Sequence, residues 1–132
     1  MKIEIPDKVE DAIKVLQQLS IDNQKVYVTN VTNSGRRNLS RNLKPTLCII
    51  VLSGSSPNEH HYNNLHYWFS GGHIKLITLK GKTINISNNM NKIEFFTTYE
   101  EAVESYNEQI EASKSIFYDI INYRESLKIK KN

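Results

Sequence analysis

The chain has 132 residues, of which 39% are hydrophobic and 23% are charged, and its formal net charge is +3 at pH 7. These values are typical of a single globular domain and exclude a disordered chain. The longest apolar run, Leu47 to Leu52, is far shorter than the roughly 20 residues of a membrane-spanning helix. The mild positive charge permits an anionic partner but does not argue for nucleic acid.

The first 14 residues, MKIEIPDKVEDAIK, lack the uninterrupted apolar stretch of a signal peptide. Cys48 is the only cysteine, which excludes an internal disulfide and a multi-thiolate metal site. We therefore expect a soluble cytoplasmic protein that does not contact the membrane and carries neither metal nor cofactor.

The N-terminal third is predicted to hold two strands and two helices. Lys2 to Ile5 and Lys25 to Thr32 are the strands, the second because it is rich in β-branched residues. Between them, a helix is expected to start at Pro6-Asp7, because apolar residues repeat at helical spacing: Val9, Ala12, Ile13, Leu16 and Leu19. A short amphipathic helix is predicted before Pro45, with one basic stripe of Arg37, Arg41 and Lys44.

The run Leu47–Leu52 is apolar at every position, which is typical of a central strand covered on both faces, most often in a parallel sheet. The next stretch predicts a helix to about Ser70, opened by Ser56-Pro57-Asn58-Glu59 and stopped by Gly71-Gly72. His73 to Lys80 is the following strand. Together these segments predict a right-handed β-α-β unit.

Two more short strands, 83–87 and 92–97, precede the last third of the chain. A helix is predicted over 99–128, capped by Thr97 or Thr98 with Glu100 or Glu101. A heptad-like seam, mostly apolar, runs through positions 103, 106, 110, 113, 117, 120, 124 and 127. This seam predicts self-association as a homodimer. The alternative is that the helix breaks near Ser113-Lys114-Ser115 and folds back.

The best candidate site combines two segments that both follow predicted strands. Small residues at the end of the central strand could let an anion approach the backbone at a helix N-terminus, while arginines could hold its charge. If both strands ran parallel, these segments would share one sheet edge. The predicted ligand-binding residues are Gly35, Arg36, Arg37, Arg41, Ser53, Gly54, Ser55 and Ser56. The alternatives are an ordinary capped turn and a solvated basic connector.

Other chemistry is less well supported by the pattern. On one helix, His60, His61 and His66 would point about 100° or more apart, which does not suit a metal site. A serine nucleophile would need a base and an oxyanion hole, and the G-x-S-x-G elbow is absent. No catalytic residue can be assigned. Tyr62 and Trp68 are expected to belong to the helix face that covers the sheet.

The segment IEFFTTYEEAVESY resembles the last strand and helix of STAS domains, and LCIIVLSGSS resembles their central strand and loop. The resemblance covers less than half of the chain and implies a shared layout. KGKTINISNNMN stands where those domains have a helix, and their Asp-Ser-Ser-Gly-like phosphorylation motif is absent.

The sequence thus predicts one α/β domain over 1–132. It is a small α/β sandwich with a mixed β-sheet, a central buried strand at 47–52, flanking helices and a long C-terminal helix. The expected function is that of a non-enzymatic binding or regulatory module, which self-associates and binds an anionic small ligand such as a nucleotide. The alternative is a small phosphoesterase or nuclease. The identity of the ligand and the biological pathway stay open.

Overall fold

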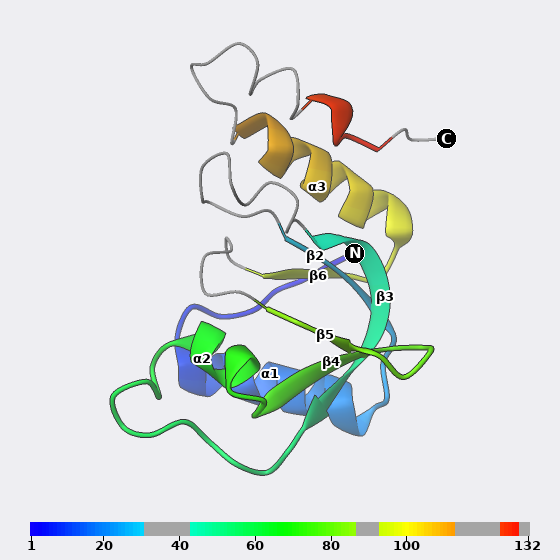
Figure 1. Ribbon diagram of the computed structural model, residues 1–132. Helices are drawn as coiled ribbons and strands as arrows, with labels where there is room; N and C mark the ends of the chain where they lie inside the picture. Colours follow the sequence, from blue (N-terminus) through cyan, green and yellow to red (C-terminus); the bar gives the residue numbers. More distant parts are fainter. Residues whose placement is uncertain (31–42, 87–92, 113–124, 130–132) are drawn as a thin grey trace. The chain divides into compact units, whose positions relative to one another are not determined.

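The computed structural model describes residues 1–30, 43–86, 93–112 and 125–129. Within these ranges, the chain forms helices and six strands (Figure 1). The strands follow the hydrogen-bonded order β1 (Lys2–Ile3), β6 (Glu94–Phe96), β2 (Val26–Asn30), β3 (Leu43–Leu52), β4 (Ile74–Thr78) and β5 (Thr83–Ile84). The expected α/β fold with a C-terminal helix is confirmed. The predicted mixed sheet is corrected, because the strand pairs β1–β6, β2–β6, β3–β4 and β4–β5 are antiparallel. The chain divides into two compact units, and the strand β3 (Leu43–Leu52) contributes residues to both.

The first unit consists of residues 1–3, 27–46 and 89–132. Its strands are β1 (Lys2–Ile3), β6 (Glu94–Phe96) and most of β2 (Val26–Asn30), and β6 pairs antiparallel with both others. The helix α3 (Tyr99–Ala112) packs on β6 (Figure 1). Aromatic and β-branched residues of β2 and β6 are buried, among them Val28, Phe95 and Phe96, as the strand propensity of these segments predicts.

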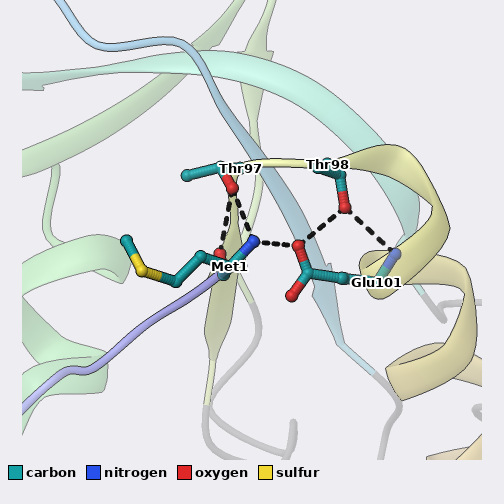
Figure 2. A network of polar contacts seen from close by, with 4 residues as sticks. All are labelled: Met1, Thr97, Thr98 and Glu101. Atoms are coloured by element: carbon teal, nitrogen blue, oxygen red, sulfur yellow. Dashed lines mark hydrogen bonds and ion pairs between the residues drawn. The ribbon is translucent and has the colours of Figure 1, made fainter.

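The cap of α3 matches the sequence prediction. The backbone N–H of Glu101 donates to Thr98 Oγ1 at 3.3 Å, and Thr98 Oγ1 donates to the Glu101 carboxylate at 2.7 Å. Figure 2 shows that the N-terminal ammonium of Met1 joins this network, pairing with Glu101 and donating to Thr97 Oγ1 at 2.7 Å. The exposed start of α3 is therefore held to the first residue of the chain by charge and hydrogen bonds.

The prediction of one helix over 99–128 is wrong. Within the described residues α3 ends at Ala112, and Ile129 exchanges two hydrogen bonds of 2.9 Å with the Asn107 side chain. In one straight helix these residues would lie about 33 Å apart, at 1.5 Å per residue. Leu127 and Ile129 instead pack against Tyr106 and Ile110. The chain therefore returns to α3, as the folded-back alternative required.

The second unit consists of residues 4–26 and 47–88. It contains the helix α1 (Val9–Ile21), which buries Val9, Ala12 and Leu16, three of the five residues of the predicted apolar face. The strands β4 (Ile74–Thr78) and β5 (Thr83–Ile84) pair antiparallel, and the short helix α2 (Leu65–Ser70) contacts β4. Both predicted strands, 73–80 and 83–87, are thus confirmed in shortened form.

The predicted β-α-β unit is wrong, because β3 and β4 pair antiparallel, from Cys48 opposite Thr78 to Leu52 opposite Ile74. The run Leu47–Leu52 is not covered on both faces either. Cys48 and Ile50 are buried, whereas the other side chains of the run are only half-buried: Leu47, Ile49, Val51 and Leu52. The alternation is that of an antiparallel strand with one covered face. Burial raises the pKa of the Cys48 thiol to about 12, so it is a core residue and not a reactive thiol.

Two predicted helix positions also need correction. The helix expected from Pro57 begins only at Leu65, where the Asn64 side chain accepts a hydrogen bond from the backbone N–H of His66 at 3.1 Å. The predicted basic helix before Pro45 is contradicted at its end, since Leu43 and Lys44 already belong to β3. Its other residues, 36–42, lie outside the described part of the chain.

Candidate functional site

The segment Ser53–Ser56 is an exposed loop directly after β3, and no helix follows it within eight residues. The sequence argument that a helix N-terminus would attract an anion here is therefore wrong. Gly54 has a φ of +84°, a conformation that side chains with a Cβ rarely adopt, and no atom lies within 4 Å of the place a Cβ would take. The loop thus keeps open space above its backbone.

Ser53 and Ser55 converge on a histidine from the next strand. The antiparallel ladder continues one step past Leu52 and Ile74, since the backbone N–H of Ser53 donates to the carbonyl of His73 at 3.0 Å. The Ser55 hydroxyl lies 2.7 Å from His73 Nδ1 and 2.7 Å from Ser53 Oγ. Three side chains with exchangeable protons thus meet at this end of the β3–β4 pair; we call them the Ser–His cluster.

One arrangement of protons satisfies all contacts of the Ser–His cluster. Ser53 Oγ donates to the carbonyl of His73 at 3.2 Å, so Ser53 Oγ accepts from the Ser55 hydroxyl. The Ser55 hydroxyl then accepts from His73 Nδ1. In this arrangement the imidazole is a donor toward Ser55, whereas a general base would have to accept the serine proton.

The His73 ring is held by its surroundings. Trp68 of α2 makes an edge-to-face contact with it at 6.1 Å between ring centroids. A Cβ on Gly71 would lie 2.9 Å from His73 Nε2, so only glycine leaves room for the ring at this distance. Within the described residues, Ser55 is the only side chain that forms a hydrogen bond with the imidazole.

Lys75 adds a positive charge close to His73 in the sequence. It follows His73 by two residues along the chain; His73 lies just before β4, which begins at Ile74, and Lys75 lies within the strand. Lys75 is exposed and has no ion-pair partner within the described ranges. It also borders a hollow of about 180 Å³ together with Ser70, Gly72 and Asn85. The Ser–His cluster itself does not line this hollow.

A second hollow, in the other unit, has the opposite charge. It measures about 370 Å³ and is lined by Lys2, Glu94, Phe96, Glu101, Glu104, Ser105 and Glu108. Lys2 is paired with Glu94 at 2.6 Å. Hydrogen bonds from the N-terminal ammonium and from Thr98 lower the pKa of Glu101. An anion would meet several carboxylates there, so this hollow does not fit the expected ligand.

The other predicted site residues have mixed outcomes. Gly35, Arg36, Arg37 and Arg41 lie outside the described residues, so the shared site that they were expected to form with Ser53–Ser56 stays a prediction. Ser56 is exposed beside the Ser–His cluster and does not take part in it. His73 was missed as a partner, because its position opposite Ser53 depends on the antiparallel register. A strand that begins with a histidine was the only sequence signal for it.

The aromatic residues of the loop and α2 differ from their predicted places. Trp68 is buried, as expected, but Tyr62 lies before the helix and is 39% exposed. Among the described residues, no group of three or more His, Cys, Asp or Glu could hold a metal ion. None of the helices in those ranges combines the length and apolarity needed to cross a bilayer.

The fold and the site thus define an α/β protein with an antiparallel β3–β4 pair and an exposed Ser–His cluster at its end. Comparison of the chain with protein-family models, curated proteins and solved structures gives no match.

Proposed function

We propose that this protein is a non-enzymatic binding or regulatory module for an anionic small ligand, which it holds at the Ser–His cluster and Lys75. The observation that carries the proposal is the convergence of the Ser53 and Ser55 hydroxyls on His73 in an exposed position. Hydroxyl groups rotate freely, so each can turn its proton from its neighbour to a bound oxyanion. Lys75, exposed two residues after His73, supplies attraction for the charge.

Backbone geometry supports the same ligand class. The open space above Gly54 lets a tetrahedral anion approach the loop. The hollow in the other unit is lined by carboxylates and would attract cations. The Ser–His cluster, with Lys75 two residues after His73, would instead attract anions. The predicted contribution of Arg36 and Arg37 and the predicted cytoplasmic location belong to this proposal as well.

Titration with inorganic phosphate and pyrophosphate, followed by NMR shifts of the 53–56 and 73–75 amides, tests the binding. We expect Ser55→Ala and Lys75→Gln each to weaken affinity about tenfold, since hydrogen bonds to charged groups contribute roughly 1.5–3 kcal/mol. Ser56→Ala is the matched control, because Ser56 is an exposed neighbour outside the cluster. If neither anion shifts these amides, or if Ser56→Ala weakens binding as much as Ser55→Ala, the proposal is wrong.

A small phosphoesterase is the second candidate, because a serine hydroxyl 2.7 Å from an imidazole nitrogen has the spacing of a nucleophile and its base. Two observations favour binding over catalysis. The imidazole of His73 donates to Ser55 in the proton arrangement given above, and no third side chain among the described residues forms a hydrogen bond that would orient His73. Hydrolysis of para-nitrophenyl phosphate that disappears in both Ser55→Ala and His73→Gln would instead establish the enzyme.

Self-association through the C-terminal segment is also part of the proposal. Of the predicted seam, Val103, Tyr106 and Ile110 are buried within the single chain. A dimer contact would therefore have to use the later seam positions. Light scattering of the full chain and of Phe117→Glu tests this, and a monomeric mass for the unsubstituted chain would contradict it.

A further inference from the structure

Tyr62 is an exposed aromatic residue connected to the Ser–His cluster through ring contacts. Its ring packs against Trp68 in an edge-to-face contact, with 5.3 Å between centroids and an interplanar angle of 69°. Trp68 in turn contacts His73 at 6.1 Å. The two rings at the ends of this series, Tyr62 and His73, are thus no further apart than these two steps combined.

The contact with Trp68 covers at most one face of the Tyr62 ring. In an edge-to-face pair, one ring presents only its edge and the other uses only one of its faces. Tyr62 is 39% exposed, whereas Trp68 is 5% exposed. The neighbouring rings of His61 and Tyr67 are stacked on each other at 3.9 Å and 17°, and both residues are only half-exposed. Tyr62 is therefore the exposed residue among the tyrosine, tryptophan and phenylalanine side chains of this segment.

The backbone and the ring of Tyr62 both contact Trp68, so the ring is positioned before a ligand binds. Trp68 Nε1 donates a hydrogen bond to the Tyr62 carbonyl at 2.9 Å, and this bond connects the loop to the buried helix α2. A preorganised ring costs less entropy on binding than a freely rotating one.

We infer that the ligand is a mononucleotide, whose phosphate binds at the Ser–His cluster and Lys75 while its base stacks on Tyr62. This inference rests on the proposed function and narrows its ligand class. A mononucleotide consists of a phosphate and a planar base that are separated by a ribose. The protein likewise has an anion site, at the Ser–His cluster, and an exposed aromatic ring, Tyr62, which is connected to it through Trp68 by two ring contacts. Every base has a π-face, so stacking alone does not select among them.

The test uses the intrinsic fluorescence of Trp68, which is the only tryptophan of the chain and lies in contact with Tyr62. The probes are inorganic phosphate, ribose 5-phosphate and adenosine 5′-monophosphate, added to the full chain. We expect adenosine 5′-monophosphate to bind more tightly than ribose 5-phosphate and to change Trp68 emission. Tyr62→Ala should weaken its affinity about 5- to 150-fold, the range of one base–aromatic stack, and leave phosphate affinity unchanged.

Two controls separate the possible outcomes. Tyr62→Phe keeps the ring and should retain nucleotide affinity, and Tyr99→Ala removes a comparably exposed tyrosine from the other unit, which should have no effect. If Tyr62→Ala weakens phosphate and nucleotide equally, Tyr62 only supports the loop and the inference is wrong. It is also wrong if the nucleotide binds no tighter than ribose 5-phosphate, although the proposed function then stands. Absence of phosphate binding would overturn both.

Discussion

The Ser53, Ser55 and His73 side chains form a cluster because each is held by a different constraint. Ser53 is fixed by the backbone ladder, Ser55 by the bend at Gly54, and His73 by the Trp68 ring and the close approach of Gly71. Donors fixed in this way lose little freedom when a ligand binds. This preorganisation is the residue-scale reason for preferring a binding role.

The Thr98–Glu101 cap gives a pH-dependent prediction at the same scale. Hydrogen bonds from the N-terminal ammonium and from Thr98 lower the pKa of Glu101, so its carboxylate stabilises the fold above its unfolded pKa of about 4.3. This contribution is lost as the pH falls through the lower, folded-state value. Urea unfolding at pH 7 and pH 3 should therefore show a smaller pH effect in Glu101→Gln than in the unsubstituted chain.

Thr98→Ala should lower the free energy of unfolding by about 1 kcal/mol, the usual value of an N-cap hydroxyl. Thr46→Ala serves as the comparison, because its exposed hydroxyl donates to the carbonyl of Lys44, two residues away in the same strand. An identical pH dependence in Glu101→Gln and the unsubstituted chain would refute the role assigned to the carboxylate.

At the scale of elements, α3 is stabilised by the segment 125–129 that returns to it. The Asn107 side chain both donates to and accepts from the Ile129 backbone, and Lys128 pairs with Glu111. Leu127 and Ile129 cover Tyr106 and Ile110. Tyr106, Ile110 and Leu127 belong to the seam that the sequence predicted to contact a partner chain. They pack within the same chain instead.

Asn107→Ala should destabilise the protein by roughly 1–3 kcal/mol, because it leaves the Ile129 N–H and C=O without their partners. Asn107→Asp keeps the acceptor and should have an intermediate effect. The matched control is Glu108→Ala, an exposed position one residue further along α3. Denaturant unfolding measures all three. Equal stability of Asn107→Ala and the control would show that the returning segment contributes nothing.

At the scale of the whole molecule, the strand β3 is common to both compact units. Since a strand shared in this way cannot unfold in one unit without losing pairs in the other, we expect a single cooperative transition, in agreement with the one-domain prediction. Trp68 emission reports on the second unit, and hydrogen exchange of the α3 amides reports on the first. Coincident denaturation midpoints are expected. Separate midpoints would mean two independently folding domains.

Local patterns predicted the elements that depend on short-range physics. The face Val9, Ala12 and Leu16 of α1, the strands β2 and β4, and the Thr98–Glu101 cap follow from periodicity, β-branching and neighbouring side chains. The prediction of a helix start at Ser56–Glu59 was wrong. A good capping pattern there precedes a loop, and the helix starts only at Leu65.

What the local pattern could not decide is which segments meet. The direction of β4 against β3 brings His73 to Ser55, although 18 residues separate them, and the fold of the last segment brings Ile129 to Asn107 across 22 residues. Such contacts depend on the path of the intervening chain and on the total buried area. Neither quantity is encoded within a window of a few residues, so the fold class could be foreseen but the Ser–His cluster could not.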